Sequence, residues 1–200
     1  VLGELEITGY STYMHPFGDE HLLAIGEEID PSSGMVTGMA VSLFDVADPG
    51  APAMAERVVI PTGWNSLDAL YDHHAFTYFA ARDLLAVPVL ATDDSWGETI
   101  DFSGVAVFHV TVDEGIRQIG MLNAEPLMGQ GFDPYYDGWC NQVRRTVVIE
   151  DVLYGVGAGG VLAAHYRHPG DVVASVLFPD HGTCDEPWDG WADEDEWGWE

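Results

Sequence analysis

The sequence contains no lysine, and its 6 basic residues are all arginine. Against them stand 34 aspartates and glutamates, so the 200-residue chain carries a formal net charge of -28 at pH 7. A surface of this sign repels the phosphates of nucleic acids and of anionic lipids. The composition therefore excludes nucleic acid as a partner. It leaves two explanations of the acidity open, a saline habitat or a GC-rich genome that favours arginine codons.

Cysteine is equally scarce, with only Cys140 and Cys184 in the chain. Each lies in a glycine- or aspartate-rich stretch, and a structural metal site normally needs four ligands. A single Cys140–Cys184 disulfide is therefore favoured over a metal site, and it would imply an oxidising compartment. The alternative is a pair of free thiols.

Long apolar runs are missing as well. No stretch approaches the roughly 18 residues of a membrane span, and no signal peptide opens the chain. The sequence begins at Val1, and strand-like residues follow within a few positions. We therefore expect the chain to be cut from a longer protein, in which case the missing signal carries no information on location.

The sequence is instead rich in short apolar runs separated by turn residues. Hydrophobic residues make up 47% of the chain, which indicates a folded domain rather than disorder. The most pronounced runs are residues 74–79 and 84–89, and a short polar turn at residues 81–83 connects them. This pattern predicts an antiparallel hairpin.

The same hairpin pattern occurs three times, and two further strand-like runs follow each copy. The other two hairpins pair residues 9–14 with 21–26 and residues 145–149 with 152–157. The further runs are residues 39–46 with 54–60, 105–112 with 116–122, and 161–166 with 172–178. The second run of each unit is almost wholly apolar, which is typical of a strand buried on both faces.

Four consecutive antiparallel strands per unit are what a β-propeller blade requires. The sequence thus predicts an all-β, β-propeller-like domain over residues 1–180, with about three four-stranded antiparallel blades near residues 6–60, 67–123 and 144–178, followed by an acidic, Trp-rich tail at 181–200. Because propellers close with about four to eight blades, we expect a partial propeller. Its open faces and edges would favour self-association.

Two short motifs carry a resemblance to a known family. They are Tyr10-Ser11-Thr12-Tyr13 with His15-Pro16, and Asp72-His73 with Ala75-Phe76. Through them, residues 2–90 resemble secreted bacterial and archaeal proteins with a β-propeller distantly related to WD40 repeats; His74 departs from the pattern, where a lysine is expected. The resemblance implies a propeller fold and a secreted or cell-envelope location. The family is defined by fold and not by activity, so no catalytic residue can be transferred.

The most chemical-looking cluster is Asp72-His73-His74. An aspartate that orients an imidazole can prepare it to bind a metal or a proton. Consecutive side chains of a strand point to opposite faces, so His73 and His74 are not expected to share one site. A hydrogen-bonded structural role is therefore favoured for His73.

A second candidate is the acidic loop at residues 92–101. It offers Asp93, Asp94, Glu98 and Asp101, and carboxylate oxygens are the ligands that calcium prefers. Their spacing matches no defined calcium loop, so a solvated acidic loop is the favoured interpretation. Apart from this possible calcium ion, no cofactor is expected.

The sequence shows no nucleophile elbow, phosphate-binding glycine loop or zinc-protease helix. It therefore predicts no catalytic residues and favours a non-catalytic, exported β-propeller segment that acts as a protein-interaction scaffold. The partner would be another protein or the remaining blades of a parent chain. Two alternatives stay open: a metal-dependent, hydrolase-type enzyme that uses Asp72, His73 and the loop at residues 93–101 at the propeller mouth, and a calcium-dependent surface adhesion module.

Overall fold

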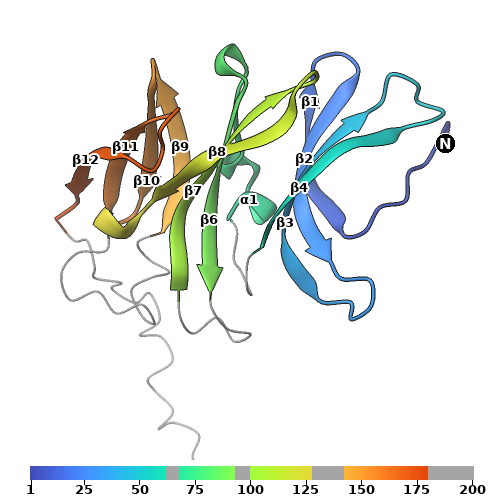
Figure 1. Cartoon of the computed structure of the whole chain (residues 1–200). Helices are drawn as coiled ribbons and strands as arrows, with labels where there is room; N and C mark the ends of the chain where they lie inside the picture. Colours follow the sequence, from blue (N-terminus) through green and yellow to red (C-terminus); the bar gives the residue numbers. More distant parts are fainter. Residues whose placement is uncertain (62–67, 93–99, 128–141, 180–200) are drawn as a thin grey trace, which may run out of the picture.

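The computed structural model describes residues 1–61, 68–92, 100–127 and 142–179. In these residues, three four-stranded antiparallel sheets follow one another along the chain (Figure 1). Each sheet is a meander in which every strand pairs with its neighbours in sequence. The prediction of an all-β chain with about three four-stranded blades is confirmed. No helix in this part of the chain is long and apolar enough to cross a membrane.

The strands and short helices have the following bounds. The first blade contains β1 (Tyr10–Phe17), β2 (His21–Ile29), β3 (Val36–Asp45) and β4 (Ala53–Pro61). The second contains β5 (Thr77–Phe79), β6 (Leu84–Thr92), β7 (Ile100–Thr111) and β8 (Gly115–Asn123). The third contains β9 (Val143–Ile149), β10 (Val152–Gly157), β11 (Gly160–His165) and β12 (Val172–Leu177). Between them lie helix α1 (Asp68–Tyr71) and the 3-10 turns η1 (His73–Ala75), η2 (Ala80–Arg82) and η3 (Glu125–Leu127).

The core is divided into two clusters by the alternation of side chains along the second blade. On β6, Leu85 and Val87 belong to a cluster shared with the first blade. Leu84 and Ala86 belong to a cluster shared with the third blade. Because successive strand residues face opposite sides of a sheet, one strand supplies both cores. This explains why β6 has no polar position from Leu84 to Leu90, as expected for a strand buried on both faces.

The junction between the first two blades also contains a polar contact at the β7–β8 turn. The backbone N–H of Ile116 donates to Glu56 Oε2 on β4 at 2.7 Å. Gly115 has a φ of 73°, and a Cβ there would overlap the Glu56 carboxylate. Glycine therefore suits the left-handed backbone, and a larger residue there would displace the Glu56 carboxylate.

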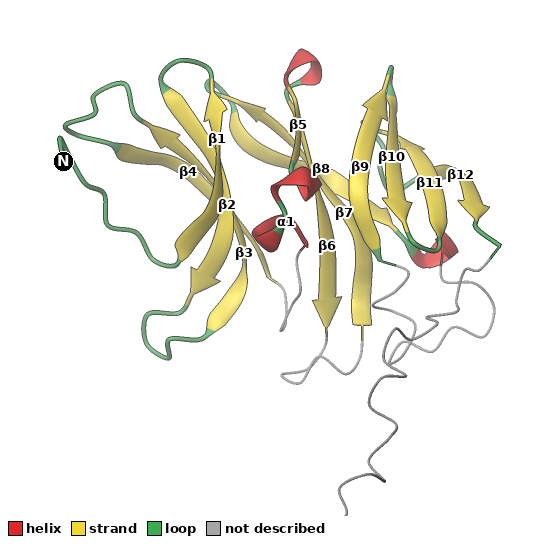
Figure 2. Cartoon of the chain, turned by 180° about the vertical axis from the view of Figure 1, so that it is seen from behind, coloured by secondary structure: helices red, strands yellow, loops and turns green. Residues whose placement is uncertain are grey.

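The predicted strand at residues 74–79 is shorter than the sequence indicated. Only Thr77–Phe79 is extended, while His73–Ala75 forms η1. The carboxylate of Asp72 accepts the backbone N–H of His74 at 2.9 Å and caps this turn. Local side-chain capping therefore prevails over the strand propensity of the following residues. Helix α1 precedes this turn and lies between the first and second sheets (Figure 2).

We expect Phe108→Ala to lower the free energy of unfolding by about 3–5 kcal/mol, because it opens a cavity in the core between the first two blades. Phe108 on β7 is fully buried in that cluster. The measurement is urea unfolding followed by circular dichroism. Val112→Ala, at a position 52% exposed beyond the same strand, serves as the control and should change the value by no more than about 0.5 kcal/mol. Equal effects of the two substitutions would contradict this placement of the core.

Candidate functional site

The structure brings Asp72, His73 and His74 together. One potential ligand atom from each lies within 4.8 Å of the other two. The imidazole centroids of His73 and His74 are 4.0 Å apart. The expectation that the two histidines point to opposite faces was wrong, because they lie on a 3-10 turn and not on a strand.

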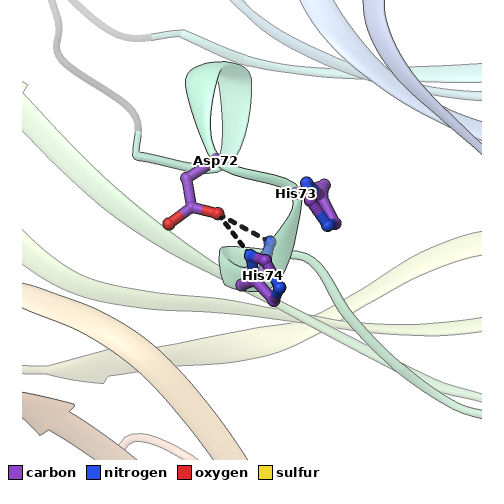
Figure 3. Close-up of side chains that lie close together, drawn as sticks. All are labelled: Asp72, His73 and His74. Carbon is purple, nitrogen blue, oxygen red and sulfur yellow. Dashed lines mark hydrogen bonds and ion pairs between the residues drawn. The ribbon is translucent and has the colours of Figure 1, made fainter.

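Both carboxylate oxygens of Asp72 have partners. Oδ1 lies 2.9 Å from the backbone nitrogen and 2.9 Å from Nδ1 of His74 (Figure 3). Oδ2 forms an ion pair with the guanidinium of Arg145 on β9. The backbone N–H and ring nitrogen of His74, followed by Arg145, lower the pKa of Asp72 to about 2. The group is therefore a carboxylate at neutral pH.

Because of these partners, Asp72 is better suited to link two blades than to bind a metal ion. Asp72 precedes the second blade, and Arg145 belongs to the third. A divalent cation would have to displace the guanidinium or lie next to it, and both arrangements cost electrostatic energy. A second contact joins the same edges, since the hydroxyl of Thr77 donates to the carbonyl of Thr146 at 3.3 Å.

His73 belongs to an aromatic array that joins the first two blades. Its members are Tyr13, His15 and Phe17 on β1, together with His73, Phe76 and Tyr78 at η1 and β5. The ring of Tyr13 stacks on His73 at 6.0 Å and meets the edge of Phe76 at 5.1 Å. Phe17 packs against Tyr78 at 5.2 Å, and burial raises the pKa of the Tyr78 hydroxyl. The three β1 residues alternate along the strand, so they face the same neighbour.

The array gives the two sequence motifs a structural meaning. Tyr13 and His15 come from the first motif, and His73 and Phe76 from the second. The motifs are therefore the two sides of one junction between blades. Sequence reasoning singled out both motifs but did not pair them, although the Tyr13-x-His15-x-Phe17 alternation was a visible signal of a shared face.

A cavity of about 380 Å³ accompanies this junction, and its wall consists of Thr12, Tyr13, Leu70, Tyr71 and His73. Of the three clustered residues, only His73 reaches it. The described wall residues contribute hydroxyls, apolar groups and the His73 imidazole, but no carboxylate. The carboxylate of Asp72 therefore does not share this cavity with His73.

The remaining predicted site residues cannot be placed together. Asp93, Asp94 and Glu98 lie outside the described residues, as do Cys140 and Cys184. Asp101 belongs to β7 by its backbone, and its side chain is not described. Calcium binding and the disulfide therefore stay predictions.

Three consecutive meander sheets with shared apolar interfaces define this protein as one of β-propeller architecture. The sequence pattern of the family described as Beta propeller domain matches residues 1–168, and the chain belongs to this family. An uncharacterized protein of Methanocaldococcus jannaschii is 36% identical over 88 residues, and one of Archaeoglobus fulgidus is 31% identical over 88 residues. Each match covers 44% of this chain but 13% of the relative's length.

We expect Asp72→Asn to lower the melting temperature at neutral pH, because it removes the charge that pairs with Arg145. The folded pKa of about 2 lies below the ordinary aspartate value of 3.8, so the carboxylate stabilises the fold above about pH 4. This contribution is lost as the pH falls toward 2. The difference between wild type and variant should therefore be constant at neutral pH and shrink in acid.

Thermal melts over this pH range measure the effect. The control is Asp113→Asn, which removes the same charge from an exposed turn. Combining Asp72→Asn with Arg145→Gln should be less destabilising than the sum of the two single changes. Additive effects would show that the two side chains do not interact.

We also expect that Zn²⁺ does not bind this cluster and therefore leaves the melting temperature unchanged. The reason is that the Asp72 carboxylate already pairs with Arg145. A ligand that binds only the folded state at 100 times its dissociation constant adds about 2.7 kcal/mol, which a melting curve resolves. The comparison is between wild type and His73→Gln, with EDTA and then with added Zn²⁺. A rise in wild type that disappears in His73→Gln would show that the cluster is a metal site.

Proposed function

We propose that the chain is a non-catalytic, exported β-propeller segment that acts as a protein-interaction scaffold. The observation that carries this proposal is the outer face of the third blade. It is largely apolar, and no further sheet of the described chain lies against it (Figure 1).

The register of the third blade defines this outer face. Tyr154 on β10 lies opposite Val147 on β9, and Val161 on β11 lies opposite Val176 on β12. Directly opposed residues of antiparallel strands share one face of the sheet. Leu153 directly precedes Tyr154 on β10, so its side chain points to the opposite face, into the core shared with the second blade. The third blade thus has one covered apolar face and one open apolar face.

The open face exposes large side chains. Val147 is 45% exposed, Ile149 56% and Val176 61%. Isolated exposed valines are ordinary, but a contiguous apolar face on a sheet marks an interaction surface. Among the described strands, its edge strand β12 pairs with β11 alone, so the other side of β12 is not occupied by a strand of the described sheets.

The occupant that fits this face is another blade-like β-sheet. The two covered junctions of this chain are both contacts between apolar sheet faces, and propellers close with about four to eight such units. The relatives are several times longer than the segment that matches this chain, which leaves room for further blades in those proteins. A protein partner with such a sheet, the remaining blades of a parent chain, or a second copy of this chain would supply it.

The exported location is part of the proposal. It is supported by the resemblance to secreted proteins and by the predicted Cys140–Cys184 disulfide. A metal-dependent enzyme has weaker support, because the carboxylate of its cluster already pairs with Arg145 and does not line the adjacent cavity.

The protein should self-associate through the open face at high concentration, and the double variant Val147→Asp/Val176→Asp should stay monomeric. Sedimentation equilibrium measures this, and a thermal melt checks that the variant is folded. Both positions are exposed, so the variant should keep the stability of the wild type within about 1 kcal/mol.

The matched control is a double change outside the first and third blades, Tyr71→Asp/Val112→Asp. These residues are 78% and 52% exposed, and the change adds the same charge. The control should associate as the wild type does. A wild type that is monomeric at every concentration, or a control that dissociates equally, would argue against a docking role for the third blade.

A further inference from the structure

A cleft of 550 Å³ lies where the second and third blades meet. Three of the six arginines of the chain line it, namely Arg82 on η2, Arg117 on β8 and Arg167 two residues after β11. They come from three separate turns or strand starts. In a chain with a net charge of -28, this concentration of cations on one cleft is unexpected for a surface whose only role is solubility.

The strand register explains why the cleft is polar. On β7, Val105 and Val107 are fully buried and belong to the core between the second and third blades. The next residue on the same face is His109, which lies opposite Arg117 on β8. The apolar row that joins the two blades therefore ends in two nitrogen-rich side chains, and the space beyond them is the cleft.

Some of these side chains have partners in the described part of the protein and others do not. Arg82 lies 3.5 Å from Asp151, and His109 Nδ1 lies 3.5 Å from Glu114. Within the described ranges, Arg117 makes no hydrogen bond or ion pair. The guanidinium of Arg167 lies 5.3 Å from the centroid of the Tyr166 ring.

The cleft therefore holds two arginines, Arg117 and Arg167, whose charge no described carboxylate pairs with directly. Asp83 is the one acidic residue among the lining residues described. Two unpaired guanidinium groups from different elements suit an anion with two charges and oxygens in several directions. A phosphate monoester carries about -1.5 to -2 charges at pH 7 and three acceptor oxygens. One arginine guanidinium can bind both oxygens of a single carboxylate, so a carboxylate ligand would not need the second arginine.

The volume and walls of the cleft point to more than a free phosphate ion. A space of 550 Å³ lies within the range of small-molecule sites. Ile119 and Tyr166 supply apolar and aromatic wall next to the arginines. We propose that this cleft binds a small phosphate monoester, with Arg117 and Arg167 holding the phosphate and Ile119 and Tyr166 contacting the organic part.

Isothermal titration calorimetry with 4-nitrophenyl phosphate at constant ionic strength tests the proposal. 4-Nitrophenyl sulfate has the same organic part and a single negative charge, and 4-nitrophenyl glucoside has none. The phosphate ester should bind most tightly, the sulfate ester more weakly and the glucoside not at all. Inorganic phosphate should bind more weakly than the phosphate ester, because it lacks the part that contacts the apolar wall.

Arg117→Gln and Arg167→Gln should each weaken binding of the phosphate ester about tenfold or more, since each removes one charge-assisted contact. Arg144→Gln is the matched control, because it removes the same charge from an exposed position on β9 outside the cleft. It should leave the affinity unchanged. Arg117 and Arg167 are both exposed, so the variants should fold, and thermal melts verify this.

The proposal is overturned if wild type does not bind the phosphate ester. It is equally overturned if both cleft variants bind as tightly as wild type, or if Arg144→Gln weakens binding as much as they do. The last result would show attraction by the whole protein and not by a site. These outcomes do not depend on the open face of the third blade, because that face lies on the side of the blade opposite to the cleft.

Discussion

The packing of sheet face against sheet face is the constraint on which this structure depends. A four-stranded meander with one apolar face cannot bury that face alone, and each blade here relies on a neighbour. The second blade illustrates the constraint most clearly, because Leu84 and Leu85 are adjacent in sequence yet belong to different cores. The second blade is covered by a neighbouring sheet on both faces, whereas the third blade is covered on one face.

Polar contacts then fix how the blades meet. The Asp72–Arg145 ion pair ties the start of the second blade to β9, and Glu56 binds the N–H of Ile116 across the first junction. Such surface contacts contribute little free energy individually. Their effect is to set the register of one blade against the next, while the apolar clusters supply the stabilisation. Asp72, from the motif that most resembled a catalytic cluster, thus makes one of these contacts between blades.

The strands were predictable because their signals are local. Apolar runs such as residues 84–89, bounded by turns, indicate buried strands without any knowledge of the fold. The turn at His73 was not predictable in the same way, because the Asp72 cap competes with strand propensity within a few residues. The aromatic contact of Tyr13 with His73, and the cleft formed by Arg117 and Arg167, join residues far apart in the sequence. Both depend on how the blades are placed, which no local pattern records.

Native-state hydrogen exchange tests the central claim, that cover from neighbouring blades determines the stability of each blade. The amides of β6 and β7, whose strands are covered on both sides, should exchange with the highest opening free energy in the protein. Those of β11 and β12 should open at a lower free energy, through local unfolding of the third blade. Equal protection of the second and third blades would contradict the account, because it would show that the open face does not lower the opening free energy of the third blade.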